Sequence, residues 1–308
     1  MDEVFDVMIV GAGAAGLTAG IYASRAKLNT IILNEGAIGG QMVLTNEVAN
    51  YPGVETTKGF VLASTMKKQA KDFGCKIKSN VKIDEYNLNG PIKTVRLTDG
   101  RTFSAKSVIL AQGGRPRSLN ISGEDEYKGT GISYCATCDG EFFTDKELIV
   151  VGGGNSALEE AVTLTKYATK VTVVHQFDHF QAFEHAIEEA KRNPKIDFIM
   201  ESELRGFNGN GKLEKVSIEH LPSAKVTEKQ VDGVFIFIGY LPNTETLKGV
   251  VQLNDKNEIL VDADMRTNIP GVFAAGDCIN KRYRHVTTAV PDGTIAALSA
   301  AEYLRTQS

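Results

Sequence analysis

Along this chain, short runs of β-branched residues alternate with Ala-rich stretches that have one apolar face. Residues 5–35 read as a short apolar strand, a Gly-rich turn, an Ala-rich helix and a second β-branched strand. Residues 146–176 repeat this plan, with Gly152 in the place of Gly11. Two βαβ units so far apart in one chain predict two nucleotide-binding-type domains.

The segments around the repeated units add hairpins and a helix. Residues 93–111 read as a hairpin that turns at Asp99-Gly100, and a second hairpin turns at residues 209–211. Residues 60–74 predict an amphipathic helix. The apolar face of that helix comprises Leu62, Met66, Ala70 and Phe73.

The order of these segments predicts that the second domain is inserted into the first. Residues 115–131 are rich in Gly, Ser, Pro and charge and read as a linker, while residues 271–277 read as a further strand followed by a helix to Leu304. We therefore expect an α/β protein with two Rossmann-like, three-layer ββα dinucleotide-binding domains. The first comprises residues 1–114 and 243–308, and the second comprises residues 115–242.

Composition excludes several classes of protein. The 308 residues are 42% hydrophobic and 23% charged, which is ordinary for globular domains. A formal net charge of −4 argues against a nucleic-acid binder, which is usually basic. No apolar run approaches the roughly 20 residues of a membrane helix, and residues 1–6 do not form a signal peptide. We expect a cytoplasmic protein in a reducing compartment, without a membrane or nucleic-acid partner.

The first Gly-rich turn has the residues that a dinucleotide site requires. Gly11 allows the tight turn, Gly13 lets a pyrophosphate approach the helix N-terminus, and Gly16 packs helix against strand. Glu35 follows the second strand and offers its carboxylate to a ribose. Because the whole strand-turn-helix-strand-acid context is present, this turn predicts a dinucleotide site.

A second segment points to the same ligand. Residues 274–277, AAGD, end a buried strand on an acid. Asp277 offers oxygens to ligand hydroxyls, and Gly276 leaves room where the ligand passes, although Asp277 alone would also suit a helix cap. Together with the first turn, this segment predicts FAD, whose ribityl chain would bridge the two.

The pair Cys135 and Cys138 is spaced C-x-x-C within CATCDG. A zinc half-site would need a second such pair or clustered histidines, whereas Cys75 and Cys278 are isolated. A structural disulfide would add little stability across so short a loop and would suit an oxidising compartment. A catalytic dithiol that closes and opens reversibly fits best. No metal is expected.

Several motifs together resemble the low-molecular-weight, FAD-dependent thioredoxin reductases over essentially the whole chain. The resemblance implies FAD in the discontinuous outer domain and the Cys pair on the inner domain. It also implies a homodimer and a domain swing that presents the pair to thioredoxin. The motifs are GAGAAG (11–16), GGQ (39–41), ANYPG (49–53), CATCDG (135–140), GGGNSA (152–157) and TNIPGVFAAGD (267–277).

The resemblance also implies roles for individual residues. Cys138 matches the sulfur that receives electrons from the flavin, Cys135 the sulfur that attacks thioredoxin, and Asp139 the acid that protonates a departing thiolate. His285 stands where the family has a Gln beside the flavin. The FAD contacts that we assign are Gly11, Gly13, Ala14, Gly16, Glu35, Gly40, Gln41, Asn50, Gly276, Asp277, His285 and Val286.

The chain departs from the family after the second βαβ unit. Three arginines that grip the NADP 2′-phosphate in the family are replaced by Gln176, Phe177 and Gln181. Each charge-assisted hydrogen bond to a phosphate contributes about 1.5–3 kcal/mol, so losing two weakens binding by about 100-fold or more. NADH is not favoured either, because an NAD site prefers an acid where the chain has Gln176.

The chain is similar in this respect to the family subset that takes electrons from ferredoxin. A ferredoxin partner is acidic and would need a basic patch, for which residues 67–71 (Lys67, Lys68, Lys71) and 281–284 (Lys281, Arg282, Arg284) are the candidates. Other readings remain. The Gly152 turn would still suit an NADPH-dependent thioredoxin reductase with an atypical phosphate site. A small-molecule dithiol oxidase would share FAD and the Cys pair. A ferredoxin–NADP reductase fits badly, because it would lack that pair. A flavin-bearing redox sensor would bind FAD without catalytic turnover.

Overall fold

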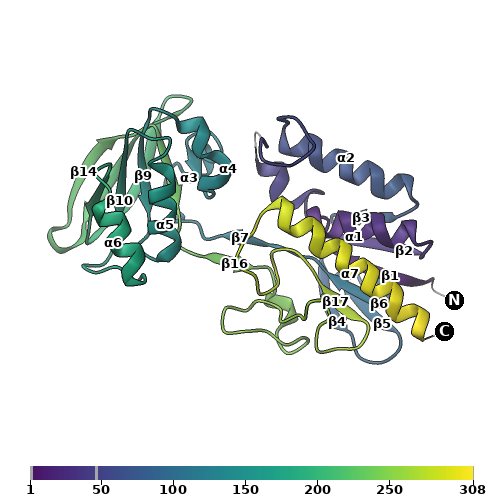
Figure 1. The fold of residues 1–308 in the computed structure, drawn as a ribbon. Helices are drawn as coiled ribbons and strands as arrows, with labels where there is room; N and C mark the ends of the chain where they lie inside the picture. Colours follow the sequence, from purple (N-terminus) through teal and green to yellow (C-terminus); the bar gives the residue numbers. More distant parts are fainter. Residues whose placement is uncertain (1–2, 46–47, 308) are drawn as a thin grey trace. The chain divides into compact units, whose positions relative to one another are not determined.

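The computed structural model describes residues 3–45 and 48–307, which form two compact units (Figure 1). Unit 1 comprises Met1–Arg115 and Leu241–Ser308, and unit 2 comprises Pro116–Tyr240. The chain passes between them through two short strands that pair with each other, β7 (Gly114–Pro116) and β16 (Tyr240–Pro242). The predicted α/β class with two Rossmann-like domains is confirmed.

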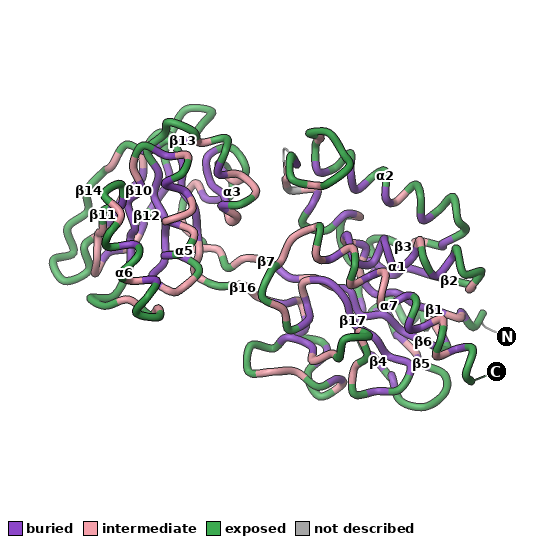
Figure 2. The backbone as a smooth tube through the Cα atoms, in the orientation of Figure 1, coloured by how far each residue is buried: buried purple, intermediate pink, exposed green. Residues whose placement is uncertain are grey.

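Unit 1 is built on a sheet whose parallel strands run in the order β3-β2-β1-β6. Strand β6 is long enough to pair with β17 through its second half and with the antiparallel β5 through its first half. The central parallel strands β1, β2, β6 and β17 carry apolar residues that are buried at successive positions and hence on both faces, as parallel sheets require, and Figure 2 shows this burial along the backbone. The strands are β1 (Val4–Val10), β2 (Thr30–Asn34), β3 (Lys76–Ser79), β4 (Ile83–Asn87), β5 (Lys93–Leu97), β6 (Thr102–Leu110) and β17 (Val272–Ala274).

Helices α1 (Ala14–Arg25), α2 (Gly59–Asp72) and α7 (Val286–Thr306) cover one face of this sheet. A second core lies on the other face, where β4, β5 and residues from the C-terminal segment pack. Small residues let α1 and α7 approach each other closely. At Gly293 of α7, a Cβ would lie only 2.2 Å from the carbonyl oxygen of Ala15 in α1. The short helices η1 (Gly40–Leu44) and η4 (Glu245–Leu247) complete the unit.

Unit 2 repeats the three-layer plan around a parallel sheet in the order β11-β10-β9-β15-β8. Helices pack on one face and an antiparallel three-stranded sheet packs on the other. The parallel strands are β8 (Ile132–Ser133), β9 (Glu147–Val151), β10 (Lys170–Val174), β11 (Ile196–Ile199) and β15 (Gly233–Ile236), and the antiparallel ones are β12 (Ser202–Gly209), β13 (Leu213–His220) and β14 (Lys225–Gln230). The helices are α3 (Glu124–Tyr127), α4 (Ala136–Asp139), η2 (Gly140–Phe143), α5 (Asn155–Leu164), α6 (Glu184–Arg192) and η3 (Leu221–Ser223).

Two local predictions were wrong. Phe73 was assigned to the apolar face of the amphipathic helix, but it follows the end of α2 and is 43% exposed, with the Arg25 guanidinium over its ring. The segment predicted as a linker is ordered instead. Its buried Glu124 carboxylate accepts backbone N–H bonds from Leu119 and Asn120, which hold this segment in place. Within the described part of the chain, no helix is both long and apolar enough for a membrane span.

Candidate functional site

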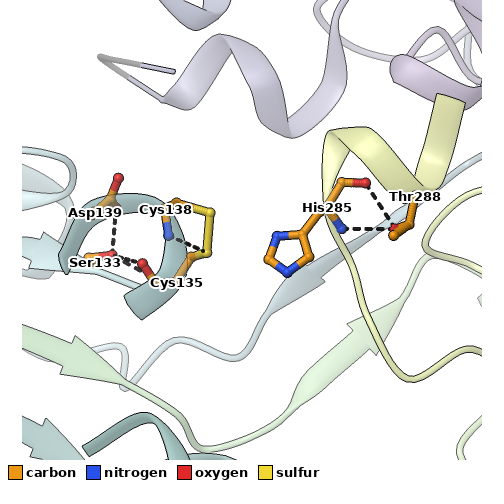
Figure 3. The surroundings of a disulfide bond; sticks show 6 residues. All are labelled: Ser133, Cys135, Cys138, Asp139, His285 and Thr288. Atoms are coloured by element: carbon orange, nitrogen blue, oxygen red, sulfur yellow. Dashed lines mark hydrogen bonds between the residues drawn. A yellow bond between two sulfur atoms is a disulfide. The ribbon is translucent and has the colours of Figure 1, made fainter. Parts of the chain in front are cut away.

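The Cys pair lies just past the carboxyl end of β8 (Figure 3). Cys135 is the N-cap of α4, and its Sγ accepts a bond from the Cys138 N–H at 3.2 Å. The two sulfurs form a disulfide, and both residues are half-buried. The loop and first turn of a short helix therefore hold two sulfurs in bonding geometry, as reversible dithiol chemistry requires.

The remaining two cysteines are buried thiols with little reactivity. Burial raises the pKa of Cys75 to about 11 and that of Cys278 to about 12. Because the thiolate is the nucleophile, both remain protonated and inert at neutral pH.

Asp139 ends α4 and is partly buried beside the Cys pair. Burial raises the pKa of its carboxyl, and a hydrogen bond from Ser133 opposes that rise. The Ser133 hydroxyl lies 2.6 Å from Asp139 Oδ2 (Figure 3). A carboxyl with a raised pKa suits a proton donor. Sequence reasoning missed Ser133, and the signal was a small polar residue ending a buried strand two positions before the first cysteine.

In unit 1, the glycines of the first turn are required by the backbone. Gly11 has φ +106°, and a Cβ there would lie 2.2 Å from the Ala111 carbonyl oxygen. A Cβ at Gly16 would lie 1.9 Å from the Gly11 carbonyl oxygen, so this glycine lets α1 pack against the turn. Helix α1 begins at Ala14, and its N-cap, Gly13, makes no side-chain capping bond. The first N–H groups of α1 are therefore free of a side-chain cap and suit a phosphate.

The residues after β2 hold this turn in shape. The Asn34 side-chain oxygen accepts a bond from the Ala12 N–H at 2.9 Å, and its amide nitrogen donates to the Gly36 carbonyl. Glu35 is exposed, and one of its carboxylate oxygens accepts the Ile83 N–H at 2.8 Å. Since a carboxylate has further lone pairs, Glu35 can still accept a hydrogen bond from a ribose hydroxyl. Sequence reasoning missed Asn34, a polar residue that ends a fully buried strand.

The GGQ segment meets the same turn. The Gly39 N–H donates to the Ala12 carbonyl at 2.8 Å. Gly40 has φ +57°, and a Cβ there would lie 3.2 Å from the Gly13 Cα. Gln41 follows on η1 and is exposed, and Asn50 is also exposed, two residues beyond Val48. The structure therefore brings Gly40 to the first turn and leaves Gln41 and Asn50 facing solvent.

A third segment approaches α1 from the end of β17. A Cβ at Gly276 would lie 2.8 Å from the Ala15 Cβ, and the Gly276 N–H donates to Asp292 at 3.2 Å. Asp277 follows and is half-buried. His285 is the N-cap of α7, where its N–H donates to the Thr288 hydroxyl at 3.2 Å, and Val286 begins the helix (Figure 3).

These observations fit an adenine dinucleotide in unit 1. Glycine backbone from three segments lies around the uncapped N-terminus of α1, where side chains would fill the space. An acid that can accept from a ribose follows the neighbouring strand. This set of groups could hold the pyrophosphate and ribose of FAD, which is the fit expected from the sequence.

Unit 2 contains a second turn of the same kind. Gly152 has φ +130°, and a Cβ there would lie 2.4 Å from the Phe237 carbonyl oxygen. Gly154 is the N-cap of α5 and makes no side-chain capping bond. The backbone frame of a dinucleotide turn is therefore retained.

The segment after β10 folds onto this second turn. The His175 ring is buried against Gly153, where a Cβ would lie 2.5 Å from the ring atoms. The Gln181 N–H donates to the Gly153 carbonyl at 2.8 Å, and the Phe183 N–H donates to Asn155 Oδ1 at 2.7 Å. The Phe180 ring stacks on His175, with centroids 5.8 Å apart. The chain's own groups thus cover one side of this turn and bond to its Gly153 carbonyl and to the Asn155 side chain.

The three residues that replace the family's arginines are all exposed, and none carries a positive charge. They are Gln176, Phe177 and Gln181. No Lys or Arg occurs in residues 171–190, whereas Asp178 and Glu184 contribute negative charge. The edge of this turn is therefore a poor place for a phosphate dianion.

Both basic patches carry ion pairs that lower their charge toward an acidic partner. Lys281 is paired with Asp292 and Arg284 with Glu258, so most of the positive charge in residues 281–284 is neutralised. In the patch at residues 67–71, Lys68 is paired with Asp72 on the exposed surface of α2.

Comparison with known proteins extends over almost all of the chain. A protein-family model described as pyridine nucleotide-disulphide oxidoreductase matches residues 5–293. A thioredoxin reductase of Peptoclostridium acidaminophilum is 44% identical over 311 residues, which cover 99% of this chain and 98% of that protein. A 34.2 kDa protein in a rubredoxin operon of Clostridium pasteurianum is 43% identical over 303 residues, 98% of each chain.

A solved structure has the same fold. The crystal structure of thioredoxin reductase from Streptococcus pyogenes MGAS5005 matches with a TM-score of 0.95 and 40% identity, covering 99% of this chain and 100% of that one. The likeness therefore extends over both units.

Proposed function

Because the chain belongs to the pyridine nucleotide-disulphide oxidoreductase family and, within it, to the low-molecular-weight FAD-dependent thioredoxin reductases, we propose that it reduces a thioredoxin with electrons from reduced ferredoxin rather than NADPH. The disulfide-reductase chemistry depends on Cys135 and Cys138. The choice of donor depends on the second glycine turn. We further propose a homodimer, which sedimentation of the purified protein tests.

FAD is the cofactor of this family and, when bound, accepts electrons singly or in pairs and supplies two for disulfide reduction. We assign its pyrophosphate to the N–H groups at the start of α1, with Gly11, Gly13, Ala14 and Gly16, and its ribose to Glu35. The other assigned contacts are Gly40, Gln41, Asn50, Gly276, Asp277, His285 and Val286.

The roles of the redox residues follow from their chemistry. In the reduced protein, the Cys135 thiolate attacks the partner disulfide, and Asp139 gives a proton to the departing thiolate. The Cys138 thiol then loses its proton and attacks Cys135 Sγ, which releases the second thioredoxin sulfur and restores the Cys135–Cys138 disulfide. The partner gains two electrons from the dithiol and two protons, one from Asp139 and one from the Cys138 thiol. The raised pKa of Asp139 supports its assignment as the acid.

One observation carries the proposed donor. The segment that follows β10 packs His175, Phe180 and the Gln181 backbone onto the second turn and offers no cation to a 2′-phosphate. A ferredoxin near −400 mV and a thioredoxin near −270 mV differ by about 130 mV, or about 6 kcal/mol for two electrons, so the transfer is favourable. Since ion pairs lower the charge of both basic patches, we expect ferredoxin docking to depend on further groups besides Lys67, Lys68 and Lys71 and residues 281–284.

The retained backbone of the second turn favours one alternative. Gly152 and the uncapped N-terminus of α5 would suit a pyrophosphate, as in an NADPH-dependent thioredoxin reductase with an atypical phosphate site. The two proposals differ in which donor reduces the protein.

Anaerobic rapid mixing separates them. The oxidised holoprotein is mixed with NADPH, with NADH and with reduced ferredoxin, and the visible flavin absorbance is followed. We expect fast bleaching with ferredoxin and none on the same time scale with either nicotinamide. Fast bleaching by NADPH at micromolar concentration would overturn the proposed donor and leave the disulfide chemistry standing.

A further inference from the structure

Ser133 connects the two reactive parts of the redox site in unit 2. Its side chain is buried, with 4% of the residue exposed. The hydroxyl oxygen accepts the Cys135 N–H at 3.1 Å and donates to Asp139 Oδ2 at 2.6 Å. One hydroxyl therefore links the backbone of the attacking cysteine to the carboxyl beside it.

The position of this hydroxyl is fixed from both sides. Ser133 is paired in register with Phe235 in the parallel sheet, so its backbone cannot shift freely. The Asp139 N–H donates to the Cys135 carbonyl at 3.1 Å, which closes the other side of the loop. A hydroxyl has one hydrogen, and the Cys135 carbonyl at 3.4 Å is a much longer acceptor than the carboxylate. The hydrogen is therefore committed to Asp139.

We propose that Ser133 is a positioning residue that holds the Asp139 carboxyl in place beside the Cys135–Cys138 loop and ties it to the backbone of Cys135. This inference rests on the proposed function, in which Asp139 protonates the thiolate released from the partner. Ser133 transfers no proton itself. It holds the carboxyl in one rotamer while the S–S bond of the partner breaks and a mixed disulfide with Cys135 forms.

The environment of Asp139 explains why such a residue matters. Burial raises the pKa of this carboxyl, and the Ser133 hydroxyl is the group that lowers it. Helix α5 packs against α4, Leu164 at its end and Tyr167 just beyond it lie next to Gly140, and the acids of α5 are Glu159 and Glu160. Removing the hydroxyl therefore raises the pKa of Asp139 further and frees its rotamer.

The test compares Ser133→Ala, Asp139→Asn and the double variant with the parent holoprotein. Each is reduced anaerobically with dithionite and mixed with oxidised glutathione, an alkyl disulfide whose departing thiolate must take up a proton, so that neither ferredoxin nor thioredoxin is needed. The rate at which the oxidised-flavin absorbance returns is measured across pH, and Ser223→Ala, an exposed serine of unit 2, is the matched control. Flavin content and circular dichroism establish that each variant is folded.

We expect Ser133→Ala to lower the rate about tenfold and to move the alkaline limb of its pH profile to higher pH. In the Asp139→Asn background, the same change is expected to have no further effect. An unchanged pH profile, or an equal loss in both backgrounds, would overturn the positioning role alone. A parent-like rate for Asp139→Asn would instead overturn the acid assigned under the proposed function, and the positioning role with it.

Discussion

The two glycine turns share a backbone plan but differ in what the next strand places against them. In unit 1, Asn34 gives its side-chain oxygen to the Ala12 N–H. The equivalent position in unit 2 is His175, whose ring lies flat against Gly153, the equivalent of Ala12. A hydrogen-bonding amide thus stabilises one turn and an aromatic ring covers the other.

This difference separates two properties that a glycine signature is taken to indicate, namely the backbone packing of the turn and the ligand that the turn binds. Gly11 and Gly152 are both needed because a Cβ would collide with the carbonyl of the residue just past the end of a neighbouring strand. That requirement comes from strand and helix packing and persists without a ligand. The residues after the second strand decide what the turn binds, and there Glu35 and Gln176 differ. The signature therefore reports the fold more reliably than the ligand.

The largest expected effect comes from removing either sulfur of the redox pair. Cys135→Ser and Cys138→Ser each leave one nucleophile without its partner, so thioredoxin reduction should fall at least about a thousandfold. Flavin content should stay at the parent level, because the change lies in unit 2. Thr137→Ala, an exposed change in the same helix, should retain full activity in the insulin-reduction assay. Substantial turnover by Cys138→Ser would contradict the dithiol assignment.

Matched glycine changes in the two turns should give different losses. Gly11→Ala and Gly152→Ala both impose a positive φ on alanine and a backbone collision, at a cost of about 1–3 kcal/mol for the dihedral alone. We expect only Gly11→Ala to be purified with little FAD, as measured from its visible spectrum. Gly36→Ala, where a Cβ meets nothing within 4 Å, is the control. Equal flavin loss in both variants would remove the distinction between the turns.

Restoring the cations should convert the second turn into a coenzyme site. In the triple variant Gln176→Arg, Phe177→Arg and Gln181→Arg, two new phosphate contacts should increase the rate of flavin reduction by NADPH about 100-fold. The control places the same added charge on exposed positions of the antiparallel sheet, with Asn208→Arg, Asn210→Arg and Gln230→Arg. An equal gain in the control would mean that net charge, rather than position, recruits NADPH.

The smallest expected effect is a difference in acid sensitivity. Burial lowers the pKa of His175, and its bond to the His179 carbonyl opposes this only partly. Below about pH 6.5 the unfolded chain binds the proton more readily than the folded one, so the stability of unit 2 falls as pH falls. Asn34 does not titrate, so the unit 1 turn lacks this dependence.

Amide hydrogen exchange of residues 152–157 and 11–16, corrected for intrinsic pH dependence, measures this difference. Exchange should increase in acid only in the second turn, and His175→Phe should abolish the increase. Persistence of the increase in that variant would assign it to another group.

The sequence predicted the repeated units, the Cys pair and the glycine turns because each depends on short-range chemistry that is visible in consecutive residues. It did not predict Asn34, whose role arises from a contact with Ala12 in a separate segment, or Ser133, whose hydroxyl meets Asp139 only once the loop and α4 have folded. The linker prediction failed for the same reason, because burial of Glu124 is a tertiary event. Charge along the sequence does not report ion pairs, so the pairing of Lys281 and Arg284 within the second basic patch could not be predicted.

Coenzyme binding to the oxidised holoprotein tests the central claim, that the second turn no longer holds a nicotinamide dinucleotide. Calorimetric titration with NADP⁺ reports this directly, without catalysis. We predict no saturable heat below about 1 mM. Saturation at micromolar NADP⁺ that disappears in Gly152→Ala would contradict the account.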